Sequence, residues 1–330
     1  MTRSEKKKRY DGMLIFVVLL LVAAGLVILY STSAYNGQVK FHDPFHYLKK
    51  QGFATLLGLF GMALIARVDY HKWVPLAIPA YVTSIILSVA VIFFGDEYNG
   101  SKRWLSLGPI SFQPSEFAKF IMIIFMSDYV IKNKNKLNGN FKSFLIFSIP
   151  LLLAFILIAK ENLSTGIVVM AVGFMIMFVA SNRVGNFVVF GMLGVLGFIL
   201  LVIVEPYRMD RIKGWLDPWS DPSDTGYQVI QSLFAVASGG LFGLGIGQSR
   251  QKTFIPESYN DIIFAIICEE LGLVGAIVVI LLFALLIWRG TKIAMTAKDK
   301  YSSYMATGIT TMIAVQVIIN ISVVTNSIPN

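Results

Sequence analysis

Asp261 opens the helix expected over the apolar run that begins at Ile263, and it is the first residue that could do chemistry. A carboxylate at the mouth of a cavity could act as a general base, although Asp is also a common helix N-cap. Glu269 would lie about 12 Å deeper on roughly the same helix face. A carboxylate at that depth needs a partner, and Lys119 or another basic residue could serve.

Four basic residues could bind a phosphate or pyrophosphate. They occur in two polar stretches, Gly100-Ser101-Lys102-Arg103-Trp104-Leu105 and Gln248-Ser249-Arg250-Gln251-Lys252. Arg and Lys together suit phosphate groups. The competing interpretation is a solvated loop face, which fits any one of these residues better than it fits the set.

A second charged stretch runs from Phe112 to Lys119. Pro114 suits the approach to a helix, Ser115 could cap it, and Glu116 and Lys119 would share one face at a spacing of three. Intramembrane charges mark functional candidates by default. A capped helix with one stabilising ion pair explains the same residues equally well.

Two further polar features have structural explanations. The stretch from Lys160 to Gly166 separates two apolar runs and predicts either a tight external turn or a broken helix that lines a cavity. Gly239, Gly243 and Gly247 are spaced by four, which is typical of a seam where helices approach closely. A phosphate-binding loop is disfavoured because no Gly-Lys-Ser/Thr ending follows.

The elements that must position these residues are membrane helices. The chain has 330 residues, of which 56% are hydrophobic and 14% charged, and its mean hydropathy is +0.70. Soluble domains have about 25% charged residues. A soluble enzyme is excluded, and the single Cys excludes a disulfide scaffold. The net charge is +9, and the basic residues responsible for it lie between apolar runs. This distribution does not indicate nucleic-acid binding.

We predict an all-α, polytopic bundle of nine membrane spans in a single integral membrane domain, residues 1–330. Lys and Arg favour a cytoplasmic basic N-terminus, residues 1–12. A large extracytoplasmic loop, residues 205–261, then separates spans seven and eight. The predicted spans are 13–30, 53–66, 73–94, 117–131, 144–158, 167–180, 187–204, 263–288 and 306–324.

The motifs quoted above resemble those of the SEDS family, which comprises the RodA, FtsW and SpoVE proteins of bacterial elongation, division and sporulation. The resemblance covers nearly the whole chain and is closer to the FtsW and SpoVE branch. It also rests on Asp217-Pro218, Gly226-Tyr227-Gln228, Gln231-Ser232-Leu233, Ser238 to Gly243, Pro256-Glu257 through Asp261, and Glu269-Glu270-Leu271-Gly272.

The resemblance implies a ten-helix peptidoglycan glycosyltransferase that polymerises lipid II at the outer face of the cytoplasmic membrane. Its protein partners would be a class B penicillin-binding protein and other divisome or elongasome membrane proteins. Undecaprenyl pyrophosphate would be the leaving group of the reaction. Asp261 would be the essential carboxylate. A divalent cation, Mg²⁺ or Mn²⁺, could assist. The expected substrate-binding residues are Lys102, Arg103, Trp104, Gln113, Ser115, Glu116, Lys119, Gln228, Gln231, Ser232, Arg250, Lys252 and Glu257.

The chain departs from the family pattern in three places. Asn162 stands where the family usually has Asp, and Asn260-Asp261-Ile262 replaces Thr-Asp-Phe but keeps the acid. The chain stops at Asn330, before the family's Leu-Pro-Phe-x-Ser-Tyr-Gly-Gly segment, so we expect a truncated product or a fragment. Two rival functions stay open: a lipid-linked precursor transporter (flippase) and a noncatalytic divisome scaffold.

Overall fold

The computed structural model describes residues 10–98, 101–107, 110–204, 206–222, 226–255 and 260–329. The chain divides into two compact units, which are described separately. Unit 1 comprises residues 1–61, 218–289 and 320–328, and unit 2 comprises residues 62–217, 290–319 and 329–330. The boundaries between them cross three long helices, at residues 61, 289 and 319.

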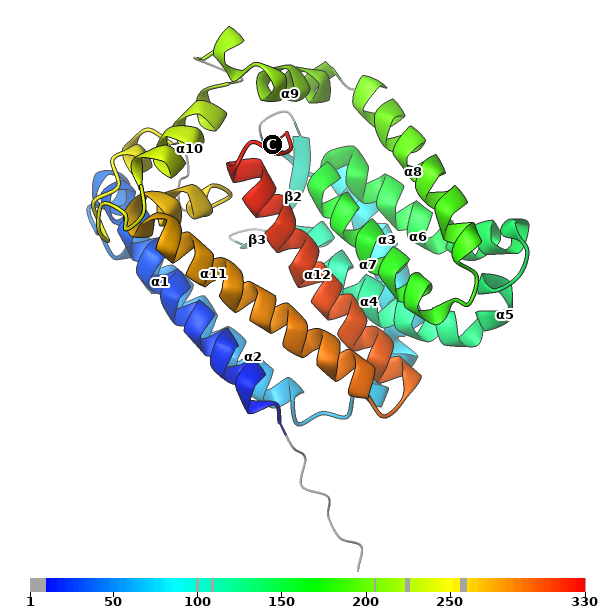
Figure 1. The fold of residues 1–330 in the computed structure, drawn as a ribbon. Helices are drawn as coiled ribbons and strands as arrows, with labels where there is room; N and C mark the ends of the chain where they lie inside the picture. The colour runs from blue at the N-terminus through cyan, green and yellow to red at the C-terminus, as the bar shows by residue number, and fades with distance from the viewer. Residues whose placement is uncertain are drawn as a thin grey trace, which may run out of the picture. The chain divides into compact units, whose positions relative to one another are not determined.

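All nine apolar runs form helices within the described residues (Figure 1). Six helical segments are long and apolar enough to cross a membrane: Gly12–Phe41, Tyr70–Phe94, Phe141–Lys160, Leu163–Ala180, Ile263–Thr296 and Lys300–Val324. The all-α, polytopic class is therefore confirmed. The other three runs lie in α2 (His46–Ile65), which begins with polar residues, in α4 (Pro114–Lys132), which carries charges, and in α8 (Val184–Val204).

Unit 2 is built around four helices that pack against one another. They are α3 (Ala77–Phe94), α4, α6 (Phe141–Glu161) and α7 (Leu163–Ala180). Their core is apolar and includes the fully buried Met126, Phe144 and Ile176. The unit also contains η1 (Tyr70–Leu76), the short α5 (Lys134–Leu137), α8, α9 (Pro206–Leu216) and most of α12 (Lys300–Val324).

A small antiparallel sheet of unit 2 departs from the all-helical expectation. Its strands β1 (Asp96–Tyr98), β2 (Ser101–Leu107) and β3 (Ile110–Phe112) pair in the order β1-β2-β3. Trp104 is paired with Asp96, and Leu105 with Phe112. The sheet joins α3 to α4, and β2 contacts α3, α4 and α6. It therefore holds Lys102 and Arg103 close to the start of α4.

Unit 1 contains α1 (Gly12–Phe41), most of α2, η2 (Pro218–Ser220), α10 (Tyr227–Ser238), η3 (Gln251–Thr253) and most of α11 (Ile263–Thr296). Its core joins α10 to α11 and includes the fully buried Ala235, Ala265 and Ile266. The predicted loop at 205–261 is thus partly helical, because α9, α10 and two short helices lie within it.

The start of α1 is tied to α11 within unit 1. Asp11 is the N-cap of α1 and accepts a 2.9 Å hydrogen bond from the N–H of Leu14. The Arg289 guanidinium on α11 pairs with the same carboxylate. The hydrogen bond from Leu14 is the main reason why the pKa of Asp11 is lower than its ordinary 3.8, and the hydrogen bond from Arg289 lowers it further.

Candidate active site

The start of α4 carries the predicted ion pair in unit 2. The Lys119 ammonium donates a 2.8 Å hydrogen bond to Glu116, three residues earlier, as the spacing predicts. The lysine side chain is only 4% exposed, whereas that of Glu116 is 50% exposed. The buried partner is therefore the cation, and its counter-ion faces outward.

The expected cap at this helix start is wrong in detail. The helix begins at Pro114, a residue whose fixed φ suits the first helical position. Gln113 is the residue just before the helix, with an extended backbone and no capping hydrogen bond from its side chain. Ser115 is consequently the second residue of the helix rather than its cap.

A small cavity of about 20 Å³ brings several predicted residues of unit 2 together, and it has room for about one water molecule. Its polar lining comes from Lys102 and Arg103 of β2, Ser88, Ser115 and Asn162, and its apolar lining from Val91, Pro114, Leu157 and Ile158. The starts of α4 and α7 both lie here, and a helix N-terminus carries partial positive charge. Two cations and two helix starts together favour an anion.

The turn between α6 and α7 is a single residue. Asn162 ends α6 and also caps α7, because its side chain accepts a 3.0 Å hydrogen bond from the N–H of Thr165. This geometry is that of a tight turn between two packed helices, and Asn162 also lines the cavity described above. Trp104, two residues beyond Lys102, is 37% exposed.

Asp261 of unit 1 lies two residues before the first residue of α11, and it is exposed. Ile262 occupies the position directly before the helix, so the N-cap interpretation of Asp261 does not hold. The main chain is fixed here because Asn320 of α12 donates a 2.7 Å hydrogen bond to the Asp261 carbonyl. The carboxylate itself remains open to a proton donor.

The segment at residues 239–250 is a series of turns rather than the helical seam that the glycine spacing predicts. The close approach is nevertheless present. A side chain at Gly239 would lie 1.9 Å from the carbonyl oxygen of Cys268, and one at Gly243 would lie 2.2 Å from that of Glu270. Gly243 and Gly247 have positive φ, which glycine adopts without strain.

A break in α11 receives this turn segment. Gly272 has φ 67° and ψ −167°, so the helical hydrogen bonds across it are replaced. The carbonyls of Glu269 and Glu270 accept instead from the N–H groups of Leu244 and Gly245, at 2.9 and 3.0 Å. The N–H groups of residues 273 and 274 donate to the carbonyls of residues 240 and 241. The turn segment therefore substitutes for one missing turn of helix.

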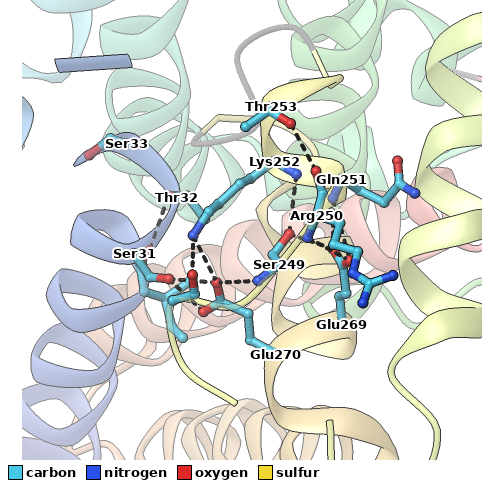
Figure 2. Close-up of polar contacts among 12 residues, drawn as sticks. Ser31, Thr32, Ser33, Ser249, Arg250, Gln251, Lys252, Thr253, Glu269 and Glu270 are labelled. Atoms are coloured by element: carbon cyan, nitrogen blue, oxygen red, sulfur yellow. Dashed lines mark hydrogen bonds and ion pairs between the residues drawn. The ribbon is translucent and has the colours of Figure 1, made fainter. Parts of the chain in front are cut away.

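Two fully buried carboxylates on α11 bind the end of the turn segment (Figure 2). Glu269 accepts hydrogen bonds from the Ser249 hydroxyl and from the N–H groups of Arg250 and Gln251. Lys119, the suggested partner of Glu269, is paired with Glu116 instead. Backbone and hydroxyl donors therefore take the place of a basic side chain.

Glu270 was not among the predicted site residues. It accepts a 2.6 Å hydrogen bond from the Ser31 hydroxyl of α1, and its carboxylate lies 3.7 Å from the Lys252 ammonium. The signals that could have identified this cluster are two adjacent acids in an apolar helix and the polar triplet Ser31-Thr32-Ser33 in another.

The remaining predicted residues are on α10 or outside the described chain. Gln228, Gln231 and Ser232 share one face of α10, with both glutamines half-buried. The Ser232 hydroxyl donates to the carbonyl of Gln228, so its hydrogen is used within the helix. Glu257 lies outside the described residues. Among those that are described, no three His, Cys, Asp or Glu side chains could together hold a metal ion.

A family model described as "Cell cycle protein", covering the FtsW, RodA and SpoVE proteins, matches residues 11–330. The chain belongs to this family. It is 42% identical to Stage V sporulation protein E of Bacillus subtilis (strain 168) over 332 residues, which cover 98% of this chain and 90% of that protein. It is 34% identical to the protein named "Probable peptidoglycan glycosyltransferase FtsW" of Geobacter sp. (strain M18), covering 97% and 88% of the two chains.

Solved structures agree with this family membership. A structure described as "Structural coordination of polymerization and crosslinking by a peptidoglycan synthase complex" matches with a TM-score of 0.78 and 26% identity, over 98% of this chain and 89% of that chain. Thermus thermophilus Rod shape determining protein RodA matches with a TM-score of 0.69 and 25% identity, over 96% and 86% of the two chains. The predicted resemblance to the SEDS family is thus confirmed.

Proposed function

We propose that this SEDS protein polymerises lipid II into glycan strands at the outer face of the cytoplasmic membrane, during division or sporulation. Its FtsW relatives are named as peptidoglycan glycosyltransferases, which supports this reaction class. The six long apolar helices support a multi-pass membrane location. The distribution of Lys and Arg along the sequence supports a cytoplasmic N-terminus.

The position of Asp261 carries the proposal. It is an exposed carboxylate directly ahead of a helix that is apolar enough to span the membrane. A substrate with a lipid tail must react at the membrane surface, because its tail stays in the hydrocarbon. A general base for that substrate is needed at the same depth, and the end of a spanning helix supplies it.

In the proposed mechanism, Asp261 takes the proton of the 4-hydroxyl of one lipid-linked disaccharide. The freed oxygen attacks the anomeric carbon of a second disaccharide, and the bond to pyrophosphate breaks with inversion at that carbon. The electron pair leaves on undecaprenyl pyrophosphate. Arg250 and Lys252, which lie in the same unit as Asp261, supply positive charge for this leaving group.

We also propose a protein partner and a metal ion for this reaction. A class B penicillin-binding protein serves as the transpeptidase partner, which fits the likeness to a solved peptidoglycan synthase complex. A divalent cation, Mg²⁺ or Mn²⁺, would take its ligands from one carboxylate, the pyrophosphate and water. No step above depends on it.

The test is polymerisation of fluorescent lipid II by the full chain with its class B partner in nanodiscs, with and without EDTA. Glycan strands made by the wild type and lost with Asp261→Asn would support both the reaction and the base. Equal product from Asp261→Asn would overturn the role of Asp261. An intact complex that makes no strands, assayed in parallel for lipid II flipping, would favour a transporter or a scaffold.

A further inference from the structure

Two adjacent buried carboxylates lie beside the cations of unit 1. Glu269 and Glu270 are both 0% exposed. Burying a carboxylate is costly unless it is hydrogen-bonded or paired. Consecutive helix residues point about 100° apart, so these two reach different neighbours. The mechanism above uses neither of them.

Glu269 binds the main-chain N–H groups of Arg250 and Gln251. The N–H of Arg250 lies 2.9 Å from its carboxylate and that of Gln251 lies 3.4 Å away, while Ser249 donates its hydroxyl. Arg250 is the N-cap residue of η3 but forms no capping hydrogen bond with its own side chain. The acceptor comes from α11 instead. The Arg250 backbone is fixed in this way while its side chain remains exposed.

Glu270 binds the Lys252 side chain. The ammonium lies 3.7 Å from the carboxylate and donates a 2.6 Å hydrogen bond to the carbonyl of Gly247. The Lys252 side chain is only 13% exposed. Ser31 holds the same carboxylate from α1, and the N–H of Ser249 donates to it at 3.4 Å. Figure 2 shows both acids converging on the turn from residue 249 to residue 253.

We propose that Glu269 and Glu270 are positioning residues for the pyrophosphate of the lipid-linked donor. Glu269 acts through the backbone of Arg250, and Glu270 acts through the ammonium of Lys252. Together they fix the backbone from which the Arg250 side chain extends and hold the Lys252 ammonium before the substrate arrives, which lowers the cost of ordering this segment during binding. This role rests on the proposed function.

The first experiment is a pair of double-mutant cycles on lipid II polymerisation by the full chain with its class B partner. Glu269→Gln is combined with Arg250→Ala, and Glu270→Gln with Lys252→Met. Gln keeps the size and one acceptor oxygen of Glu, so the fold should survive. We expect each Gln variant to lower kcat/KM about tenfold, because the two cations bind the pyrophosphate and also stabilise the charge that develops on it as it leaves.

The cycles separate positioning from general stability. If Glu269 acts through Arg250, Glu269→Gln should change kcat/KM by less than about twofold once Arg250 is Ala, because coupled residues are not additive. The crossed combination, Glu269→Gln with Lys252→Met, should show weaker coupling. Additive effects in all combinations would overturn the positioning role. A wild-type chain without polymerising activity would overturn the proposed function as well.

The second experiment does not depend on activity. Trypsin cleaves after Arg, so the rate of cutting between Arg250 and Gln251 reports how firmly the turn is held. We expect Glu269→Gln to speed this cut at least about fivefold, since local opening controls proteolysis. Gln248→Ala is the matched control, because Gln248 is exposed on the same segment. An unchanged cutting rate in Glu269→Gln would overturn the proposal.

Discussion

The Ser31 hydroxyl on α1 donates a 2.6 Å hydrogen bond to the Glu270 carboxylate on α11, although the two residues are 239 positions apart in the sequence. Both groups are buried. The bond links the first apolar helix to the acid that holds Lys252, so a polar contact within the core of unit 1 reaches the candidate site. The position of Lys252 therefore depends on α1 and α11 as well as on the turn at residues 249–253.

Asp261→Asn should lower kcat/KM for lipid II about 10³-fold, within the range of general-base contributions. Asn is close in size but cannot take the proton. Asp210→Asn is the matched control, because Asp210 is an exposed acid on α9 that pairs with Lys213, three residues away. Strand synthesis followed on gels provides the rates. A loss with Asp210→Asn as large as that with Asp261→Asn would contradict a specific base.

The Glu116 and Lys119 pair should respond unequally to substitution. Glu116→Gln leaves a buried ammonium without its counter-ion, which costs about 1–3 kcal/mol. Lys119→Met leaves only a half-exposed carboxylate that water can solvate. We therefore expect Glu116→Gln to lower the thermal unfolding midpoint more than Lys119→Met does. The double variant should recover most of the loss, and failure to recover it would show that the pair is not the cause.

Gly272→Ala should destabilise the protein by about 2 kcal/mol or more, because Ala cannot adopt this backbone conformation without strain. Its Cβ would also lie 2.4 Å from the N of Gly243 and 2.6 Å from the carbonyl of Leu241. Gly25→Ala, in α1 with open space around it, should be neutral or stabilising. Thermal unfolding in detergent compares the two. If Gly272→Ala lowers the unfolding midpoint no more than Gly25→Ala does, the helix break can change its backbone conformation at little cost.

Asp11→Asn tests the pair with Arg289. The loss should be about 1 kcal/mol at neutral pH, because Asn still caps the helix but has no charge. Since folding lowers the pKa of Asp11, its contribution is complete above the unfolded value of 3.8 and disappears as the pH falls through the folded value. Unfolding midpoints of the two proteins should therefore converge in acid. If the difference between the two unfolding midpoints is the same in strong acid as at neutral pH, the Asp11 charge does not stabilise the fold.

Asn162→Ala should cost about 1 kcal/mol through loss of the cap on α7. Asn162→Asp places an acid at this position, and Asp caps helices as well as Asn does. We expect unchanged stability for the Asp variant. Thermal unfolding checks both substitutions, and equal midpoints for the Ala variant and the wild type would show that the cap contributes nothing.

Local features of this chain were predictable from the sequence. A spanning helix needs a long apolar run, so the helical segments could be located. The pairing of Glu116 with Lys119 follows from helical spacing alone. The sheet at residues 96–112 was missed because two of its strands have three residues each, although Asn99-Gly100 is a pair that favours hairpins.

Contacts between distant segments were not predictable. Nothing in the sequence pairs Ser31 with Glu270, and charge alone suggests a basic side chain as the partner of Glu269. The structure uses main-chain N–H groups instead, which no sequence pattern marks. The glycine spacing predicted close approach correctly, but not that turns would replace helices.

The break at Gly272 also affects how the protein enters the membrane. Taken alone, α11 has two carbonyls and two N–H groups with no partners in its own helix, and each such group costs several kcal/mol in hydrocarbon. The segment at residues 240–245 satisfies all four, and it is synthesised before the helix. Insertion of α11 and docking of that segment are therefore coupled steps, and α11 released into lipid alone would be incomplete.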